Sequence, residues 1–371
     1  MVEKIAEIKD EINDYYTNDD LYNINSYGAD LSFRELITMY EEEELIKPEL
    51  QRKYVWDKTE ASRFIDSLLL GLPVPSIFLS NTRDSKKLII DGYQRIMTVY
   101  DFVKGIWSKD NKVFKLSNSE KINTKWRNRA FIELTDSEQR KIKSTTIHAI
   151  VFEQKEPKDD DTSLYQIFER INTSGRTLMS QEIRNCIYQG LFNNLLIELN
   201  KSPKWRQLFG ESKEDDRMRD LEFILRFFAL DSEKIKNTEK GTISLKKYLN
   251  EYMGSEESEK EEVLKLRKET FEFVIDFIFE FFGENAFFNV QATDLTTIRK
   301  RFYPTIFDSL TVATAIALRN GFKSTTNLEP LRLQLLKDEN YRDSITQGTM
   351  KIEHIHGRIS KVLEDIYKMR Y

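Results

Sequence analysis

The sequence predicts an α+β protein, with a mixed α/β N-terminal domain over residues 1–190 and an all-α domain over residues 191–371. In the first half, short runs of β-branched and apolar residues alternate with segments of helical periodicity. In the second half, long aromatic-rich helical segments follow one another with few strand signals. The breaks between them fall at or near Gly241, Gly283 and Gly321. A chain of 371 residues is also long enough for two domains.

Local signals set the expected elements of the first half. Asp57 and Glu60 form a capping box at the start of one helix, and Gly71 marks its end. Further helices are expected over residues 31–40, 164–171 and 180–188, after a polar, partly helical arm that extends to about residue 27. Strands are expected over residues 77–79, 88–90 and 147–152.

Composition excludes several classes of protein. The net charge of -5 argues against a uniformly basic protein that coats nucleic acid, although a local basic groove remains compatible with it. Cys186 is the single cysteine, so an internal disulfide is excluded, and the first residues lack the apolar core of a signal peptide. The most apolar runs are interrupted by prolines or by charged residues, so no membrane span is expected. A cytoplasmic protein with no membrane partner is therefore predicted.

The stretch LIIDGYQRIMTVY, residues 88–100, combines a short strand, a turn and a helix. Asp91 and Gly92 form a strong turn signal directly after the apolar run. A strand that enters a helix through one glycine places backbone N–H groups and the positive end of the helix dipole at the turn. Gln94 and Arg95 fall in the first helical turn. This arrangement predicts an anion site, and phosphate is the usual anion.

Two other polar stretches contain arginine and lie beside strongly apolar segments: Gln51 with Arg52, and NTSGR at residues 172–176. Polar stretches in such positions often line a cleft. The planar guanidinium of arginine suits phosphate because it can donate two parallel hydrogen bonds. A surface edge for the first stretch and an ordinary helix–helix turn for the second remain open alternatives.

Four motifs together resemble the family of GmrSD-type N-terminal domains. They are QRKYVW, LLLGLPVPSIFL, IIDGYQR and FERINTSGRTLMSQEIR, in that order and over about residues 31–190. The family is similar in fold to ParB and sulfiredoxin and usually carries a DGQQR core. The resemblance implies a nucleotide-binding, often NTP-hydrolysing module of a bacterial anti-phage or modification-dependent restriction system that acts on DNA.

The resemblance also implies the residues of the site. The nucleotide site would consist of Gln51, Arg52, Asp91, Gly92, Tyr93, Gln94, Arg95, Asn172 and Arg176. Asp91 and Arg95 would be catalytic: Asp91 would position Mg²⁺ or water, and Arg95 would neutralise charge on an NTP. The expected cofactor is therefore NTP with Mg²⁺, and no metal site made by the protein alone is expected. Tyr93 stands where the family usually has glutamine, and its ring would stack on a base or pack inward.

Many relatives end in an HNH-type nuclease domain, which requires histidine ligands. His354 and His356 fall in a segment of helical periodicity, where they would lie about 200° apart and could not share one metal. His148 is expected to be a buried, hydrogen-bonded strand residue, and Cys186 has no histidine nearby in sequence. Walker-type phosphate motifs are absent from the sequence.

Two features of the second half bear on nucleic acid. The aromatic run around residues 270–288 has helical spacing and is expected to be core and not a base-stacking platform. Arg299, Lys300 and Arg301, with Phe302 and Tyr303, form a candidate DNA-facing patch, and a solvated basic turn is the alternative.

The leading hypothesis is a nucleotide-dependent NTPase whose helical half transmits the nucleotide state to DNA or to a separate nuclease subunit. The alternatives are a non-catalytic nucleotide- or DNA-binding adaptor and a ParB-like DNA nuclease. The nuclease ranks lower because no cluster of metal-binding carboxylates is visible. The sequence leaves open the nucleotide base, the DNA feature or partner recognised, and whether the chain is a monomer or a homo-oligomer.

Overall fold

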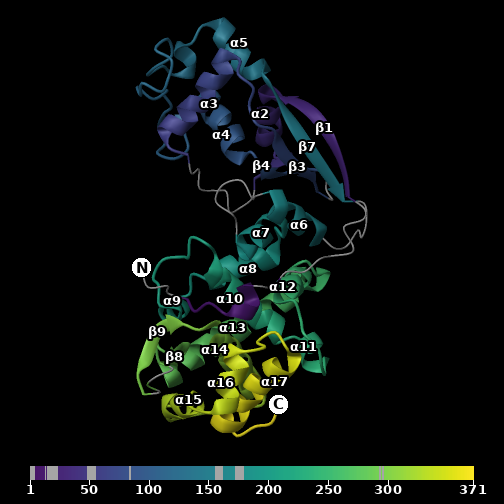
Figure 1. Ribbon diagram of the computed structural model, residues 1–371, viewed down its shortest axis with the longest axis vertical. Helices are drawn as coiled ribbons and strands as arrows, with labels where there is room; N and C mark the ends of the chain where they lie inside the picture. The colour runs from purple at the N-terminus through teal and green to yellow at the C-terminus, as the bar shows by residue number, and fades with distance from the viewer. Residues whose placement is uncertain are drawn as a thin grey trace. The chain divides into compact units, whose positions relative to one another are not determined.

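The computed structural model describes residues 5–12, 14, 24–47, 56–82, 85–154, 162–171, 179–291, 294 and 296–371. The chain divides into two compact units, an α/β unit within residues 18–178 and a helical unit that holds most of residues 179–371 (Figure 1). The helical unit also includes the first described residues, 5–14, which the sequence analysis placed in the first domain. Each unit is described by itself below.

A five-stranded mixed sheet forms the centre of the α/β unit, in the order β1-β7-β3-β4-β2. β1 (Ile24–Ser32) pairs antiparallel with β7 (Thr146–Gln154), which pairs parallel with β3 (Ile77–Asn81). β3 pairs antiparallel with β4 (Lys87–Asp91), and β4 pairs parallel with β2 (Leu45–Ile46). The α+β class predicted from the sequence is thus confirmed.

Helices cover one face of this sheet (Figure 1). They are α2 (Phe33–Glu41), α3 (Lys58–Leu70), α4 (Tyr93–Lys104) and α5 (Asp136–Ser144). Their apolar side chains pack on alternate strand residues such as Ile77, Leu79 and Ala149, all fully buried. The unit also contains α6 (Thr162–Ile171), the hairpin β5 (Ile106–Trp107) with β6 (Lys112–Val113), and the short 3₁₀ helix η3 (Phe131–Glu133).

The predicted helix boundaries of the α/β unit are confirmed where a capping signal exists. Asp57 and Glu60 form a capping box on α3, and Gly71 ends the helix in the left-handed conformation, at φ 81°. Ser32 and Glu35 form a second capping box, at the start of α2. The predicted polar arm is wrong at its end, because residues 24–32 form strand β1, which pairs with β7 over its whole length. That pairing joins segments far apart in the sequence, so no local pattern reveals it.

The Glu138 side chain links the loop before α5 to that helix through hydrogen bonds and an ion pair. Its carboxylate accepts hydrogen bonds from the Thr135 backbone N–H at 2.9 Å and from the Trp126 ring nitrogen at 2.8 Å. It also lies 2.6 Å from the Lys125 ammonium. The Lys125 and Trp126 side chains are the main reason that the pKa of Glu138 falls from 4.5 to about 2. The loop and the start of α5 therefore share one ionised carboxylate.

We expect Glu138→Gln to remove part of the acid sensitivity of the α/β unit. A carboxyl whose pKa is lower in the folded state contributes stability above its unfolded pKa, and this contribution disappears as the pH falls from 4.5 to about 2. Urea unfolding at several pH values in this window should therefore give a shallower pH dependence for the variant. Glu120→Gln changes an exposed glutamate of the same loop and should keep the wild-type slope. Equal slopes for wild type and Glu138→Gln would contradict the prediction.

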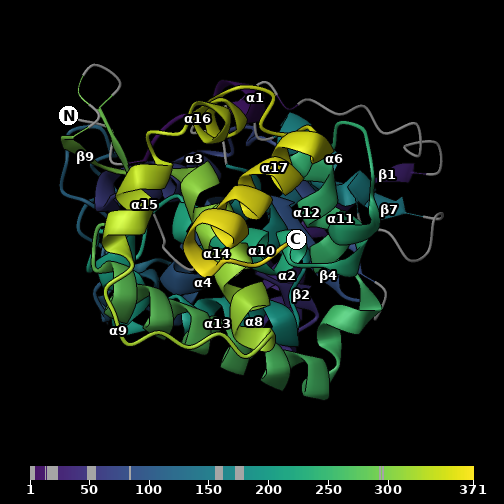
Figure 2. The same cartoon turned by 90° about the horizontal axis from the view of Figure 1, so that it is seen from below.

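The helical unit contains the rest of the described helices. In chain order they are α1 (Lys9–Ile12), α7 (Ser180–Ile187), α8 (Leu191–Leu199), α9 (Pro203–Phe209), α10 (Arg219–Leu230), α11 (Glu233–Asn237), α12 (Leu245–Met253), η4 (Glu256–Glu259), α13 (Glu261–Phe282), α14 (Pro304–Arg319), α15 (Glu329–Leu335), α16 (Glu339–Thr346), α17 (Ile352–Val362) and η5 (Leu363–Tyr367). The last three residues of α7 group with the α/β unit. α17 packs on α14 and α16 (Figure 2). Within the described residues, none of the helices has both the length and the apolar character needed to cross a bilayer.

Aromatic side chains fill the core of the helical unit. Trp205 is fully buried, and its ring lies 5.5–6.2 Å from the rings of four phenylalanines, among them Phe271 and Phe307. The prediction that the aromatic run of α13 is core is confirmed for the buried residues Phe271, Val274, Ile275 and Ile278. The predicted all-α character is wrong in one place, because β8 (Phe288–Val290) and β9 (Ile298–Phe302) form a hairpin. Phe302 of this hairpin belongs to the same aromatic core.

Residues 5–14 dock on the helical unit through backbone and ionic contacts. The Ala6 N–H donates to the Phe302 carbonyl at 2.8 Å. Glu11 accepts from both terminal nitrogens of Arg226 at 2.7 and 2.9 Å. Arg226 also donates to Asp308, and Asp308 lies 3.5 Å from Arg358. Because Arg226 and Asp308 are each 1% exposed, this ion cluster is inside the unit.

Candidate functional site

The turn between β4 and α4 requires glycine for two independent reasons. Gly92 has a φ of 102°, a conformation that side chains other than glycine rarely adopt. A Cβ atom on it would lie 2.3 Å from Cγ2 of Ile77 in β3. The predicted strand, turn and helix are all confirmed, and Gly105 ends α4 as expected.

α4 begins without a side-chain cap. Gly92 is its N-cap residue and has no side chain to accept from the first-turn N–H groups, whereas α2 and α3 each begin with a capping box. The first hydrogen bond of the helix runs from the Ile96 N–H to the Gly92 carbonyl at 3.0 Å. The positive end of the helix dipole and the first-turn N–H groups are therefore suited to an anion.

Asp91 and Arg95 flank this turn and form an ion pair. Arg95 Nη2 lies 2.7 Å from Asp91 Oδ2, and the Arg95 side chain is 16% exposed against 39% for Asp91. Arg95 Nη1 also donates to the carbonyls of Ser76 at 2.5 Å and Pro75 at 3.3 Å. Arg95 thus links the turn to the proline-rich segment before β3 through hydrogen bonds. A bound phosphate would share this guanidinium with those carbonyls.

Tyr93 and Gln94 point to different surroundings. The Tyr93 side chain is 5% exposed and belongs to the apolar core, and burial raises its hydroxyl pKa well above the usual range, with Tyr40 and Asp101 adding to the effect. The geometry therefore favours inward packing over base stacking. Gln94 accepts from the Trp56 N–H through Oε1 at 3.3 Å. This contact brings the end of the QRKYVW motif to the first turn of α4.

Four of the predicted site residues, Gln51, Arg52, Asn172 and Arg176, lie outside the described residues. The structure brings together the other five, residues 91–95, and adds Trp56 and the Pro75 and Ser76 carbonyls as their neighbours. The sequence contains no signal that the carbonyls of the proline-rich segment before β3 accept from Arg95. Contact between Gly92 and Ile77 also had no signal beyond the glycine itself.

The histidines belong to other elements than this turn. His148 is a strand residue as predicted, but the expectation that it is buried is wrong, because its side chain is 52% exposed and pairs with Asp30 at 2.8 Å. His354 and His356 both lie on α17, where they contact the carbonyls of Gln347 and Ile235, at 2.7 and 3.0 Å. Among the described residues, no group of three or more His, Cys, Asp or Glu is arranged to hold a metal ion.

The basic patch of the helical unit differs from the predicted turn. Arg299, Lys300 and Arg301 are in strand β9, and Arg301 Nε donates to the Ile5 carbonyl at 2.9 Å. Phe302 is 1% exposed, and burial raises the pKa of Tyr303. The Phe302 ring is therefore unsuited to base stacking, and the exposed charge comes from Arg299 and Lys300.

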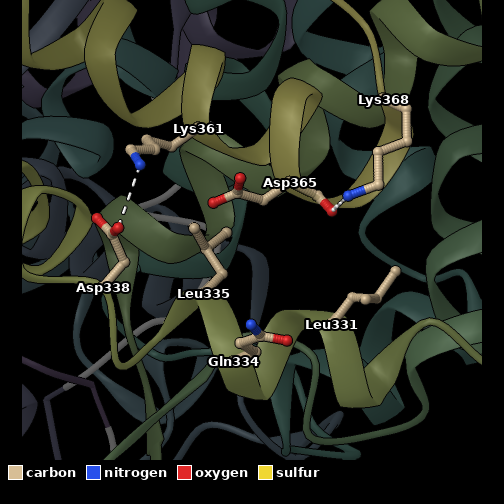
Figure 3. Close-up of a pocket in the computed structure, with 7 residues that line it drawn as sticks. All are labelled: Leu331, Gln334, Leu335, Asp338, Lys361, Asp365 and Lys368. Atoms are coloured by element: carbon tan, nitrogen blue, oxygen red, sulfur yellow. Dashed lines mark hydrogen bonds and ion pairs between the residues drawn. The ribbon is translucent and has the colours of Figure 1, made fainter.

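A polar pocket of about 370 Å³ lies among α15, α17 and η5 (Figure 3). Lys361 donates to Asp338 at 3.1 Å across it, and Lys368 donates to the Asp365 carbonyl at 2.8 Å. One pair of opposite charges, Lys361 with Asp338, is already formed there, and the pocket contains none of the residues predicted for the nucleotide site.

Comparison with known proteins finds one family that most of the α/β unit resembles. Residues 33–189 match the family model described as GmrSD restriction endonuclease, N-terminal domain. No curated protein and no solved structure matches the chain. The matched range contains the DGYQR turn and the two helices that begin with a capping box, α2 and α3. It also contains the polar segments before and after α6 in the sequence. Residues 33–189 thus resemble the N-terminal domain of GmrSD restriction endonucleases.

Proposed function

We propose that the α/β unit binds a nucleoside triphosphate with Mg²⁺ and hydrolyses it, as a module of a restriction system that acts on DNA with a partner. The observation that carries the proposal is the start of α4 at Gly92, which has no side-chain cap and lies within a GmrSD-type domain. An anionic ligand would supply acceptors for the first-turn N–H groups of this helix. A ParB-like fold for the unit belongs to the same proposal.

The described residues fit the phosphate part of such a ligand. Arg95 supplies a guanidinium beside the helix start, and two of its N–H donors are already aligned by the Asp91 carboxylate and the Ser76 carbonyl. Asp91 keeps one carboxylate oxygen beyond the Arg95 contact, and its side chain is 39% exposed. Asp91 would orient water or one metal-bound water, while the phosphates would supply the remaining Mg²⁺ ligands. Arg52 and the residues 172–176 would complete the site.

The helical unit would then transmit the nucleotide state to DNA or to a separate nuclease subunit. The exposed Arg299 and Lys300 on β9 are a candidate contact to DNA phosphates. If they serve this role, DNA binding would weaken steeply as the salt concentration rises. A homo-oligomer remains compatible with this proposal.

A second candidate function is nucleotide binding without turnover. Tyr93 favours it, because the family usually has a glutamine at this position and the tyrosine side chain is in the core. The site therefore lacks one amide that could position a water molecule. An adaptor would respond to the nucleotide by binding alone.

Calorimetry with a panel of nucleoside triphosphates and Mg²⁺, together with a phosphate-release assay, tests both candidates. We expect Arg95→Ala to weaken nucleotide binding about 10- to 100-fold, because a charge-assisted hydrogen bond and a neutralising charge are lost. Asp91→Ala should retain measurable binding and abolish phosphate release. Lys115→Ala removes an exposed lysine of the same unit, paired with Glu133 at 3.2 Å, and should leave both readouts unchanged.

The outcomes separate the hypotheses. Binding with release that depends on Asp91 supports the NTPase, and binding without release in the wild type supports the adaptor. Absence of binding for every triphosphate would contradict both. Because Arg95 also holds the turn, each variant's thermal midpoint is measured alongside, and Arg95→Lys serves as the variant that keeps the charge and loses the planar fork.

A further inference from the structure

α13 is a 22-residue helix that buries one side and leaves the other exposed. Two large apolar side chains lie on the exposed side: Leu266 is 64% exposed and Phe273 is 60% exposed. They are seven residues apart, so their directions differ by only about 20° around the helix. Both therefore belong to a single face, about two turns apart.

Carboxylates surround these two side chains. Glu262, Glu269 and Glu280 are exposed and fall within about 60° of the line through Leu266 and Phe273, whereas the exposed Lys265 lies about a quarter turn from it. Among the described residues, none of the three has an ion-pair partner within 4.0 Å. Asp276 is on the same side but is paired with Lys204 at 3.0 Å. We name this surface the α13 face and define it by Leu266, Phe273, Glu262, Glu269 and Glu280.

We propose that the α13 face is a docking surface for a cationic amphipathic helix of another protein. Two apolar side chains one heptad apart match the stripe that such a helix presents, in the manner of helix–helix recognition. Lysine or arginine residues beside that stripe would meet the unpaired glutamates, which provides orientation and a fast association rate. This inference is independent of the nucleotide site, because every residue of the face belongs to the helical unit.

Charge decides between the possible occupants. A second copy of the chain, docked through the same face, would bring like charges together around Glu262, Glu269 and Glu280, which is unfavourable. The phosphates of DNA and the headgroups of an anionic membrane would be repelled for the same reason. An exposed aromatic residue rimmed by carboxylates therefore suits a cationic protein segment.

A synthetic peptide is the probe for this surface. It has about 18 residues, leucines at heptad positions a and d, and lysines beside them, and its control is a shuffled peptide of identical composition with no apolar stripe. Fluorescence anisotropy with the full chain should show the amphipathic peptide binding at least about tenfold more tightly than the shuffled one. Phe273→Ala and Leu266→Ala should each remove most of this difference. Raising the salt concentration should weaken binding of both peptides.

Ile132→Ala is the matched control, since Ile132 is 82% exposed and lies in the α/β unit. It should leave the affinity for both peptides unchanged. Equal affinities for the two peptides, or an unchanged affinity in Phe273→Ala, would overturn the proposal. Sedimentation that shows a dimer lost in Phe273→Ala would overturn it in favour of a second copy as the occupant. A negatively charged vesicle or DNA duplex that competes with the peptide at the α13 face would also overturn it.

Discussion

Gly92→Ala is expected to destabilise the α/β unit by about 2–5 kcal/mol. Part of the loss is backbone strain, because alanine would adopt a φ of 102°. The rest is overpacking, because the new Cβ would lie 2.3 Å from Cγ2 of Ile77, the fully buried first residue of β3. Urea unfolding followed by the fluorescence of Trp107 and Trp126, both buried in this unit, measures the change.

Gly105→Ala is the matched control at the other end of α4. Its φ is 82°, but a Cβ there would meet nothing within 4 Å, so only the backbone strain of roughly 1–2 kcal/mol remains. Ile77→Ala makes room for the new methyl group, so Gly92→Ala should cost less in that background than in the wild type. Equal effects of the two glycine variants would contradict the steric explanation.

Arg226→Met is expected to destabilise the helical unit by about 3–5 kcal/mol. The substitution keeps much of the side-chain volume but leaves Asp308, which is 1% exposed, and Glu11 without their main cationic partner. A buried carboxylate that loses its partner retains the cost of desolvation without the compensating attraction. Urea unfolding followed by the fluorescence of Trp205, in the core of the same unit, reports the loss.

Two further variants identify the cause. Asp308→Asn in the Arg226→Met background should restore part of the lost stability, because it removes one of the uncompensated charges. Lys234→Met breaks an exposed pair with Glu251 in the same unit, and should cost at most about 1 kcal/mol. If Asp308→Asn restores no stability, the loss of stability in Arg226→Met comes from packing and not from the uncompensated charge.

The elements that the sequence predicted well are those with signals inside a few consecutive residues. The capping box of α3 and the Asp91–Gly92 turn are of this kind, because caps and turns depend on hydrogen bonds and φ angles between near neighbours. β1 could not be predicted in the same way. Its partner β7 begins more than a hundred residues later, and such pairing depends on the whole fold.

The candidate site was predicted in the same uneven way. Gly92 and the helix after it follow from the local pattern, so the start of α4 was identified as an anion site. The acceptors of Arg95 in the Pro75–Ser76 segment come from another strand, and their distance from Arg95 depends on how β3 and β4 pair. The sequence allowed the Tyr93 ring either to stack on a base or to pack inward, and the structure places it in the apolar core.

The contact between Glu11 and Arg226 can form only some time after Glu11 has been synthesised. The two residues are 215 positions apart, and ribosomes add ~5–20 residues per second, so roughly 10–40 s separate their synthesis. During that interval the α/β unit, which lies between them in the sequence, has time to fold. Residues 5–14 would therefore reach their final place only after the helical segments that contact them are made, and until then this nascent segment is available to chaperones or proteases.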